Sequence, residues 1–169
     1  MKTHISHSLE ETEKIAAEWL KVTAEKAGND LAAVEASEMP EATVVGLSGH
    51  LGAGKTAFVK AVAKLLGVTE TVTSPTFVIM KAYSREVKPN EDEPFFAGTP
   101  WARLIHIDAY RLESPEELEA LNFERLVADP RNLIMIEWPE NVGLGKVIGG
   151  YKQIDFEIRD GEYQIAFYN

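Results

Sequence analysis

The stretch Gly49-His50-Leu51-Gly52-Ala53-Gly54-Lys55-Thr56 decides the fold of this chain. It matches the pattern G-x-x-x-x-G-K-[ST] in full. Glycine lets the backbone fold so that successive N–H groups converge on one phosphate. A helix that begins near Lys55 would point its positive dipole end at the same place. The stretch therefore predicts a phosphate-binding loop of the P-loop type.

Two side chains of the loop have expected roles of their own. Lys55 should reach the β- and γ-phosphates of a nucleotide, and the Thr56 hydroxyl should ligate Mg²⁺. Residues 42–69 contain three lysines and no acid, in a chain of net charge −10, which favours an anionic ligand. The residues of this region predicted to bind the nucleotide are Gly49, His50, Leu51, Gly52, Ala53, Gly54, Lys55, Thr56 and Ala57. The His50 side chain itself is expected to face solvent.

The residues around the loop predict strands that alternate with helices. Residues 43–48 are β-branched and apolar, as in a buried strand, and a helical pattern runs from Lys55 to a stop at Gly67. Further strands are predicted over residues 77–80, 104–108 and 133–137.

Other patterns fill in the two ends of the chain and its connections. Ser8 and Glu11 form a capping box for a first helix that should stop at Gly28, and another helix should start at Ser114-Pro115. Residues 29–41 are predicted to be a solvated connector, with a partly helical form as the alternative, and residues 84–101 a long loop. Alternating residues on both sides of Asp160-Gly161 predict a β-hairpin with a type I′ turn.

Together these elements predict an α/β fold. We expect a three-layer P-loop NTPase-like sandwich with a mainly parallel sheet and a C-terminal β-hairpin. At 169 residues, the chain should form a single domain over residues 1–169.

Two acids follow predicted strands directly. Asp108 and Glu137 each end an apolar run, at the sheet edge where parallel α/β folds bind ligands. Either carboxylate is expected to hold Mg²⁺ or to orient water, the alternative being a solvated cap or loop charge. His106 alternates with Ile105 and Ile107, so a packed strand residue is favoured over a ligand.

Composition excludes several classes of protein. There are 27 acidic and 17 basic side chains, so the overall field repels nucleic acid and anionic membranes. There is no cysteine, which excludes disulfides, thiol nucleophiles and zinc sites of the cysteine type. The N-terminus has no signal-peptide pattern, and the longest aliphatic runs are far too short to span a bilayer. A cytoplasmic protein with no membrane partner is expected.

Four motifs taken in order resemble the TsaE (YjeE) family. They are the phosphate loop, Thr73-Ser74-Pro75-Thr76-Phe77, His106-Ile107-Asp108-Ala109-Tyr110-Arg111-Leu112 and Ile136-Glu137-Trp138-Pro139-Glu140. Members of this family are small bacterial P-loop ATPases that support threonylcarbamoyladenosine modification of tRNA. The resemblance covers about residues 8–142.

The resemblance implies a slow, Mg²⁺-dependent ATPase that acts on the TsaB–TsaD complex and meets tRNA only indirectly. It implies that Lys55 grips the phosphates, that Thr56 and Glu137 hold Mg²⁺, and that Asp108 polarises the attacking water or assists the metal. The expected catalytic residues are thus Asp108, Glu137 and Lys55. Thr76, beside Ser74 in a switch-like loop, and Trp138 join the residues expected near the nucleotide.

The chain also departs from the family pattern. His50 stands where the family usually has an acid, and Ala57 where it usually has a second hydroxyl. Other functions stay open: a small-molecule kinase, although no arginine-rich lid is apparent, or a nucleotide-dependent binding switch without significant catalysis. A GTPase is disfavoured because the sequence has no N-K-x-D motif.

Overall fold

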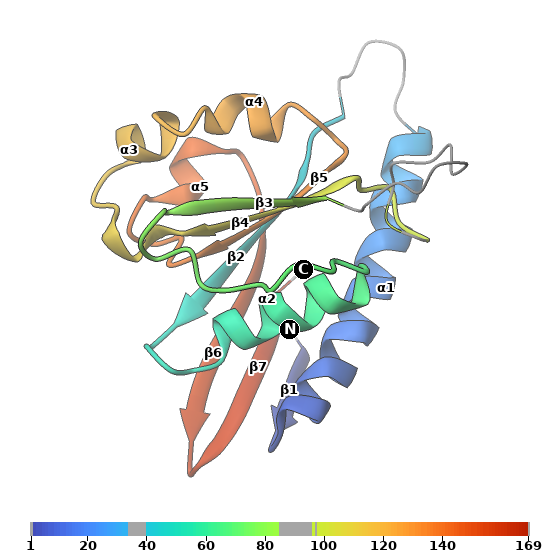
Figure 1. Ribbon diagram of the computed structural model, residues 1–169, viewed down its shortest axis with the longest axis vertical. Coiled ribbons are helices and arrows are strands. Elements are labelled where there is room, and N and C mark those ends of the chain that lie inside the picture. Colours follow the sequence, from blue (N-terminus) through green and yellow to red (C-terminus); the bar gives the residue numbers. More distant parts are fainter. Residues whose placement is uncertain (1, 34–39, 85–95, 97, 169) are drawn as a thin grey trace.

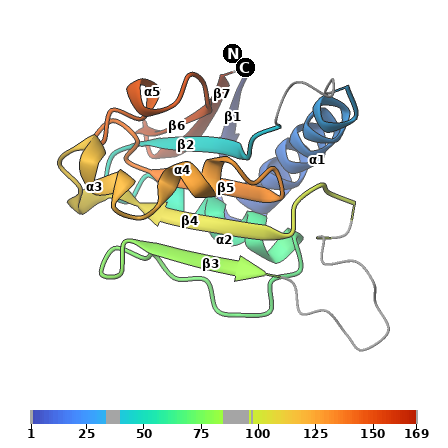
Figure 2. The same ribbon diagram turned by 90° about the horizontal axis from the view of Figure 1, so that it is seen from above.

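A seven-stranded mixed sheet forms the centre of the computed structural model, which describes residues 2–33, 40–84, 96 and 98–168. The strand order is β1-β7-β6-β2-β5-β4-β3 (Figures 1 and 2). The strands are β1 (Lys2–Ser6), β2 (Thr43–Gly49), β3 (Met80–Ser84), β4 (Arg103–Asp108), β5 (Asn132–Glu137), β6 (Lys152–Arg159) and β7 (Glu162–Tyr168). The central strands β6, β2, β5 and β4 run parallel to one another, whereas β7 pairs with β6, β1 with β7 and β3 with β4 in antiparallel fashion. The predicted mainly parallel sheet is confirmed.

Helices cover both faces of this sheet (Figure 1). One face carries α1 (Leu9–Ala33) and α2 (Lys55–Leu65), and the other carries α3 (Pro115–Glu119), α4 (Phe123–Val127) and α5 (Leu144–Val147). Phe58 of α2 packs with Leu20 of α1 in the first core, and Phe123 packs with Ile136 in the second. The predicted three-layer sandwich is therefore present.

The alternation of side chains along β4 and β5 positions the two acids. Leu104 and Met135 belong to the core beneath α1 and α2, whereas Ile105 and Ile134 belong to the core on the opposite face. Since side chains alternate along a strand, His106, Asp108 and Glu137 face the α2 side. The parallel register pairs Asp108 with Glu137 directly. Both acids thus reach the same edge of the sheet, on the same face.

Several predicted boundaries are confirmed. The Glu11 amide donates to Ser8 Oγ at 3.2 Å where α1 begins, and Gly67 ends α2 with a φ of 80°. Asp160 and Gly161 join β6 to β7 with φ values of 53° and 84°, as a type I′ turn requires.

The predicted stop of the first helix at Gly28 is wrong, because α1 continues to Ala33. A glycine inside a helix costs only about 1 kcal/mol relative to alanine, and Ala24 and Ala27 pack against the core just before it. Residues 29–33 of the predicted connector are therefore helical. Residues 34–39 of that connector lie outside the described residues.

The strand predicted over residues 77–80 is also misplaced. Phe77 and Val78 are 85% and 62% exposed, in a turn whose Val78 and Ile79 amides donate to the Pro75 carbonyl. Ile79 has a φ of 66°, which no strand residue adopts, so β3 begins only at Met80. Pairing with β4 then extends the strand to Ser84, beyond the predicted end.

Two further differences concern the predicted loop and the N-terminus. Most of the loop predicted over residues 84–101 (85–95 and 97) lies outside the described residues, but Phe96 and Trp101 are buried in the core. β1 was not predicted, and it pairs with β7 from Lys2 to Ser6. Among the described helices, none combines the length and apolar character needed to cross a membrane.

Candidate phosphate-loop site

The loop between β2 and α2 has the backbone shape of an anion-binding nest. Gly49, Gly52 and Gly54 have φ values of 138°, 80° and 105°, a region that side chains rarely allow. Gly54 is the N-cap of α2, so the helix begins at Lys55 as predicted. The amides of its first turn are therefore available to a phosphate.

Lys55 is folded back onto this loop. Its side chain is buried, and Nζ donates to the carbonyls of Gly49 at 2.5 Å and His50 at 3.0 Å. Nζ also lies 3.9 Å from the centre of the Trp138 ring, a cation–π distance. Burial lowers the pKa of Lys55, and nearby carboxylates, Glu137 foremost, oppose that shift. The ammonium is thus held against the backbone of the loop and beside the Trp138 ring.

Glu137, at the end of β5, is tied to the first turn of α2. Thr56 Oγ1 donates to Glu137 Oε1 at 2.8 Å. His106 Nε2 lies 2.9 Å from the same oxygen, and Glu137 is only 3% exposed. Two residues predicted to hold Mg²⁺, Thr56 and Glu137, are therefore in direct contact.

Asp108, at the end of β4, contacts a different segment. Its Oδ2 accepts a hydrogen bond from Ser74 Oγ at 2.9 Å and another from Thr76 Oγ1. Its Oδ1 accepts from the Tyr110 amide at 3.1 Å. Asp108 thus links the sheet edge to the loop that precedes β3.

The Trp138 ring, which lies against the lysine, is paired with a second aromatic ring. Trp138 has a φ of 60°, and its amide donates to the Leu47 carbonyl at 3.1 Å. The Tyr110 ring lies 5.3 Å from the Trp138 ring, at an interplanar angle of 56°. Sequence analysis did not include Tyr110 among the site residues, although its place two residues after Asp108 was a usable signal.

These side chains surround a cavity of about 450 Å³. It is lined by Leu51, Gly52, Gly54, Lys55, Thr56, Ala57, Ser74, Thr76, Asp108, Tyr110, Glu137 and Trp138. Three of the predicted site residues are not among the described residues that line this cavity: Gly49, His50 and Ala53. Gly49 and His50 contribute carbonyls to Lys55, the His50 side chain is exposed as expected, and Ala53 is buried.

A second cavity of about 310 Å³ adjoins the first through Gly52, Gly54 and Ala57, which line both. Its other lining residues are Ser6, Ser8, Leu9, Thr12 and Tyr163. None of these five was predicted, because they reach the loop through distant contacts: β1 pairs with β7, and α1 packs against α2. The cavity is mostly apolar with several hydroxyls at its wall.

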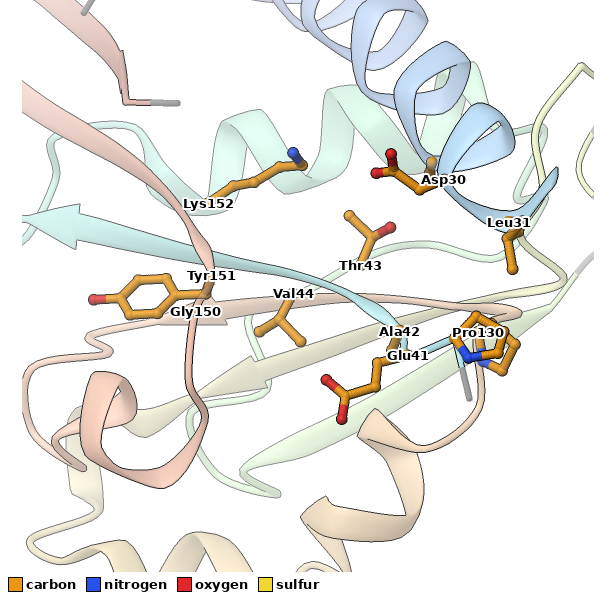
Figure 3. Close-up of a pocket in the computed structure, with 12 residues that line it drawn as sticks. Asp30, Leu31, Glu41, Ala42, Thr43, Val44, Pro130, Gly150, Tyr151 and Lys152 are labelled. Atoms are coloured by element: carbon orange, nitrogen blue, oxygen red, sulfur yellow. The ribbon is translucent and has the colours of Figure 1, made fainter. Parts of the chain in front are cut away.

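A third cavity, of about 420 Å³, lies at the opposite end of β2 (Figure 3). Thr43 and Val44 line it together with Asp30 of α1 and with Tyr151 and Lys152. Burial lowers the pKa of Lys152, and the side chain extends towards Asp30. Among the described residues, its lining includes none of the predicted site residues.

The donor set of the first cavity suits magnesium. Within the described residues, no three or more His, Asp or Glu side chains gather to form a complete metal site. Mg²⁺ is commonly held by one or two carboxylates together with substrate phosphates and water, and the oxygens of Thr56 and Glu137 meet this description. A phosphate beside Asp108 and Glu137 would also need a cation between the negative groups.

Comparisons with known proteins identify a family. The family model of threonylcarbamoyl adenosine biosynthesis protein TsaE matches residues 6–165. The chain is 34% identical over 120 residues to the tRNA threonylcarbamoyladenosine biosynthesis protein TsaE of Rickettsia typhi, covering 70% of this chain and 72% of that protein. It is 41% identical over 98 residues to the protein of that name in Streptomyces coelicolor, covering 57% of each.

A solved structure has the same fold. The crystal structure of Bacillus subtilis YdiB superposes with a TM-score of 0.61 at 26% identity, covering 98% of this chain and 83% of that one. The family model and this structure each match nearly the whole chain, whereas the two relatives match 70% and 57% of it. The chain belongs to the TsaE family of threonylcarbamoyl adenosine biosynthesis proteins.

Proposed function

We propose that this protein binds Mg-ATP at the phosphate loop and hydrolyses it slowly, in support of tRNA threonylcarbamoyladenosine biosynthesis. The observation that carries the proposal is the convergence of Lys55, Thr56, Asp108 and Glu137 on one cavity of about 450 Å³. The names of the relatives supply the pathway. The loop supplies the nucleotide chemistry.

The contacts suggest a division of roles between the two acids. Glu137, which accepts a hydrogen bond from Thr56, would share Mg²⁺ with that hydroxyl. Asp108, which accepts hydrogen bonds from Ser74 and Thr76, would position the attacking water. Lys55 would leave the loop carbonyls for the β- and γ-phosphates. Mg²⁺, when bound, would neutralise charge that develops on the phosphates.

The second cavity is the proposed place of the adenine. It shares three lining residues with the first cavity, so a nucleotide whose phosphates lie in the loop can extend into it. Leu9 and the Tyr163 ring offer apolar surface to a base, and the Ser8 hydroxyl, which accepts from the Glu11 amide, offers its proton for a hydrogen bond.

We also propose that the nucleotide cycle acts on the TsaB–TsaD pair. A net charge of −10 opposes direct binding of tRNA, so tRNA would be held by the partners. Phe77 and Val78 are largely exposed beside Ser74 and Thr76, so a partner could sense the loop that contacts Asp108.

A binding switch without significant catalysis is the second candidate. It is favoured by one observation: Asp108 already accepts three hydrogen bonds, from Ser74, Thr76 and the Tyr110 amide, which compete with an attacking water for its oxygens. Asp108→Asn separates the two candidates. If the protein is an ATPase, this variant should no longer release phosphate. If it is a switch without significant catalysis, the variant should still bind its partner in an ATP-dependent manner.

Phosphate release from Mg-ATP, measured with and without TsaB and TsaD, tests the leading proposal. We expect slow release that changes when the partners are present and that is lost in Lys55→Ala. Lys60→Ala is the matched control, since Lys60 is an exposed lysine of the same helix. Release that survives in Lys55→Ala would contradict the proposal.

A further inference from the structure

His106 is a buried titratable side chain with no role in the proposed reaction. It lies in β4 between Lys81 of β3 and Met135 of β5, and it is fully inaccessible to solvent. Its Nε2 lies 2.9 Å from Glu137 Oε1. The other ring nitrogen, Nδ1, is buried and has no hydrogen-bond partner among the described residues.

This geometry assigns the proton of the ring. With the proton on Nε2, the ring donates to the carboxylate and leaves only an acceptor unpaired at Nδ1. With the proton on Nδ1, a buried N–H would be unpaired, and the Nε2 lone pair would face a carboxylate oxygen. The second form leaves both ring nitrogens without a hydrogen bond, whereas the first form leaves only Nδ1 without one. The arrangement with a proton on Nε2 is therefore the one that fits.

We propose that His106 is a positioning residue that fixes the Glu137 carboxylate for Mg²⁺. Both hydrogen bonds from described residues to this carboxylate, from Thr56 and His106, end on Oε1. Oε2 is thus the oxygen left for a cation. The carboxylate cannot rotate away from this orientation without breaking both hydrogen bonds to Oε1. The inference rests on the proposed function, in which Thr56 and Glu137 hold the metal.

Stability alone does not account for a histidine here. Ile105 and Ile107, its neighbours in β4, fill the opposite core with apolar side chains. A histidine at this position leaves Nδ1 unpaired in the protein interior, which is a cost that an apolar residue would avoid. The contact with Glu137 offsets that cost, and partners of metal ligands commonly set ligand orientation in this way.

Three variants test the inference. His106→Leu removes the donor and keeps an apolar side chain of similar size. His106→Gln places an amide N–H at the same distance along the side chain as Nε2, so it should restore the hydrogen bond. His4→Leu is the control, since His4 is a strand histidine whose ring lies against Phe167, away from Glu137.

The first readout is the gain in ATP affinity that Mg²⁺ provides, measured by calorimetry in Mg²⁺ and in EDTA. In His106→Leu we expect that gain to fall about tenfold or more, with the affinity in EDTA unchanged within about twofold. His106→Gln should recover most of the gain, and His4→Leu should match wild type. A residue that only supported folding would lower both affinities together.

The second readout needs neither nucleotide nor metal. Nitrogen-15 NMR of the imidazole should show the proton of His106 on Nε2 in the wild-type protein. A proton on Nδ1 would overturn the inference, as would a full Mg²⁺ gain in a folded His106→Leu variant. If His106→Leu fails to fold, the NMR spectrum of the wild-type protein remains a test. The inference would also be overturned if Mg²⁺ raised the ATP affinity of His106→Gln far less than it raises that of wild type.

The failure of this inference differs from the failure of the proposed function. If wild type gains no ATP affinity from Mg²⁺, both are overturned. If wild type gains affinity and His106→Leu gains as much, only the positioning role of His106 is overturned.

Discussion

Gly49 is the first glycine of the phosphate loop, and Gly49→Ala should destabilise the fold far more than Gly52→Ala. A Cβ at Gly49 would lie 2.2 Å from the Phe156 carbonyl oxygen and 3.0 Å from its carbon. Gly49 and Phe156 are paired in the parallel β2–β6 ladder, so the obstacle is backbone that cannot rotate away. At Gly52, by contrast, a Cβ would meet nothing within 4 Å.

The magnitude follows from these distances. An ordinary carbon–oxygen contact is about 3.3–3.6 Å, so the strands would have to separate by roughly 1 Å. Such overpacking costs about 1–3 kcal/mol, and a side chain at a φ of 138° adds about 1–2 kcal/mol of strain. We expect a loss of about 3 kcal/mol for Gly49→Ala and about 1 kcal/mol, from strain alone, for Gly52→Ala.

Thermal unfolding by circular dichroism, without nucleotide, measures this difference. At about 3 °C per kcal/mol for a chain of this size, Tm should fall by about 9 °C in Gly49→Ala and by about 3 °C in Gly52→Ala. Equal losses in the two variants, or a larger loss in Gly52→Ala, would refute the steric reasoning. The comparison is made on the free protein, so it does not depend on what the loop binds.

Three further predictions concern stability away from the loop. Trp101 is fully buried, and its Nε1 donates to Thr43 Oγ1 at 3.1 Å. Trp101→Phe should therefore lower the free energy of unfolding, measured in urea, by about 1–2 kcal/mol. An unchanged free energy of unfolding would mean that this hydrogen bond does not stabilise the fold. Hydrogen bonds from Arg131 lower the pKa of Asp129 from 3.8 to about 2. The ionised Asp129 carboxylate therefore contributes up to about 2 kcal/mol to the free energy of unfolding above pH 4, and this contribution is lost as the pH falls towards 2. Acid unfolding of Asp129→Asn should lack that part of the pH dependence, and an unchanged profile would contradict the assignment. Hydrogen bonds to Glu162 and, to a smaller extent, Glu11 raise the pKa of His7 above 6.5 in the folded protein. The protonated ring therefore stabilises the fold fully below pH 6.5, and this stabilisation is lost as the pH rises through the pKa of the folded state. The unfolding midpoint of Glu162→Gln should therefore vary less between pH 6 and pH 8 than that of wild type, and equal slopes would count against the contact.

The sequence predicted best where local pattern and sheet geometry agree. The phosphate loop is defined by residue types at fixed spacing, and its glycines adopt the φ values that those types allow. The meeting of Asp108 and Glu137 was predictable because both end parallel strands, and the register then pairs them. These features need little knowledge of distant contacts.

The errors arose where distant contacts decide the outcome. β1 has the sequence Lys-Thr-His-Ile-Ser, which is short and polar, and pairing with β7 alone makes it a strand. The apolar residues Phe77 and Val78 looked like strand residues, but the turn at Pro75 leaves both exposed. His106 was expected to pack in its strand, and it is buried there, but its contact with Glu137 depends on how β4 and β5 align.

The strand order has a consequence for the time at which the site is completed during synthesis. β2, β5, β4 and β3 lie within residues 43–137, so this half of the sheet can pair while the ribosome is still working. β1 pairs with residues 163–167, whose synthesis comes on the order of ten seconds after its own at ordinary elongation rates. The cavity that holds Thr12 and Tyr163 together therefore forms last. A nascent chain would therefore first possess the phosphate loop, and the cavity proposed for the base would be completed only after β7 has been made.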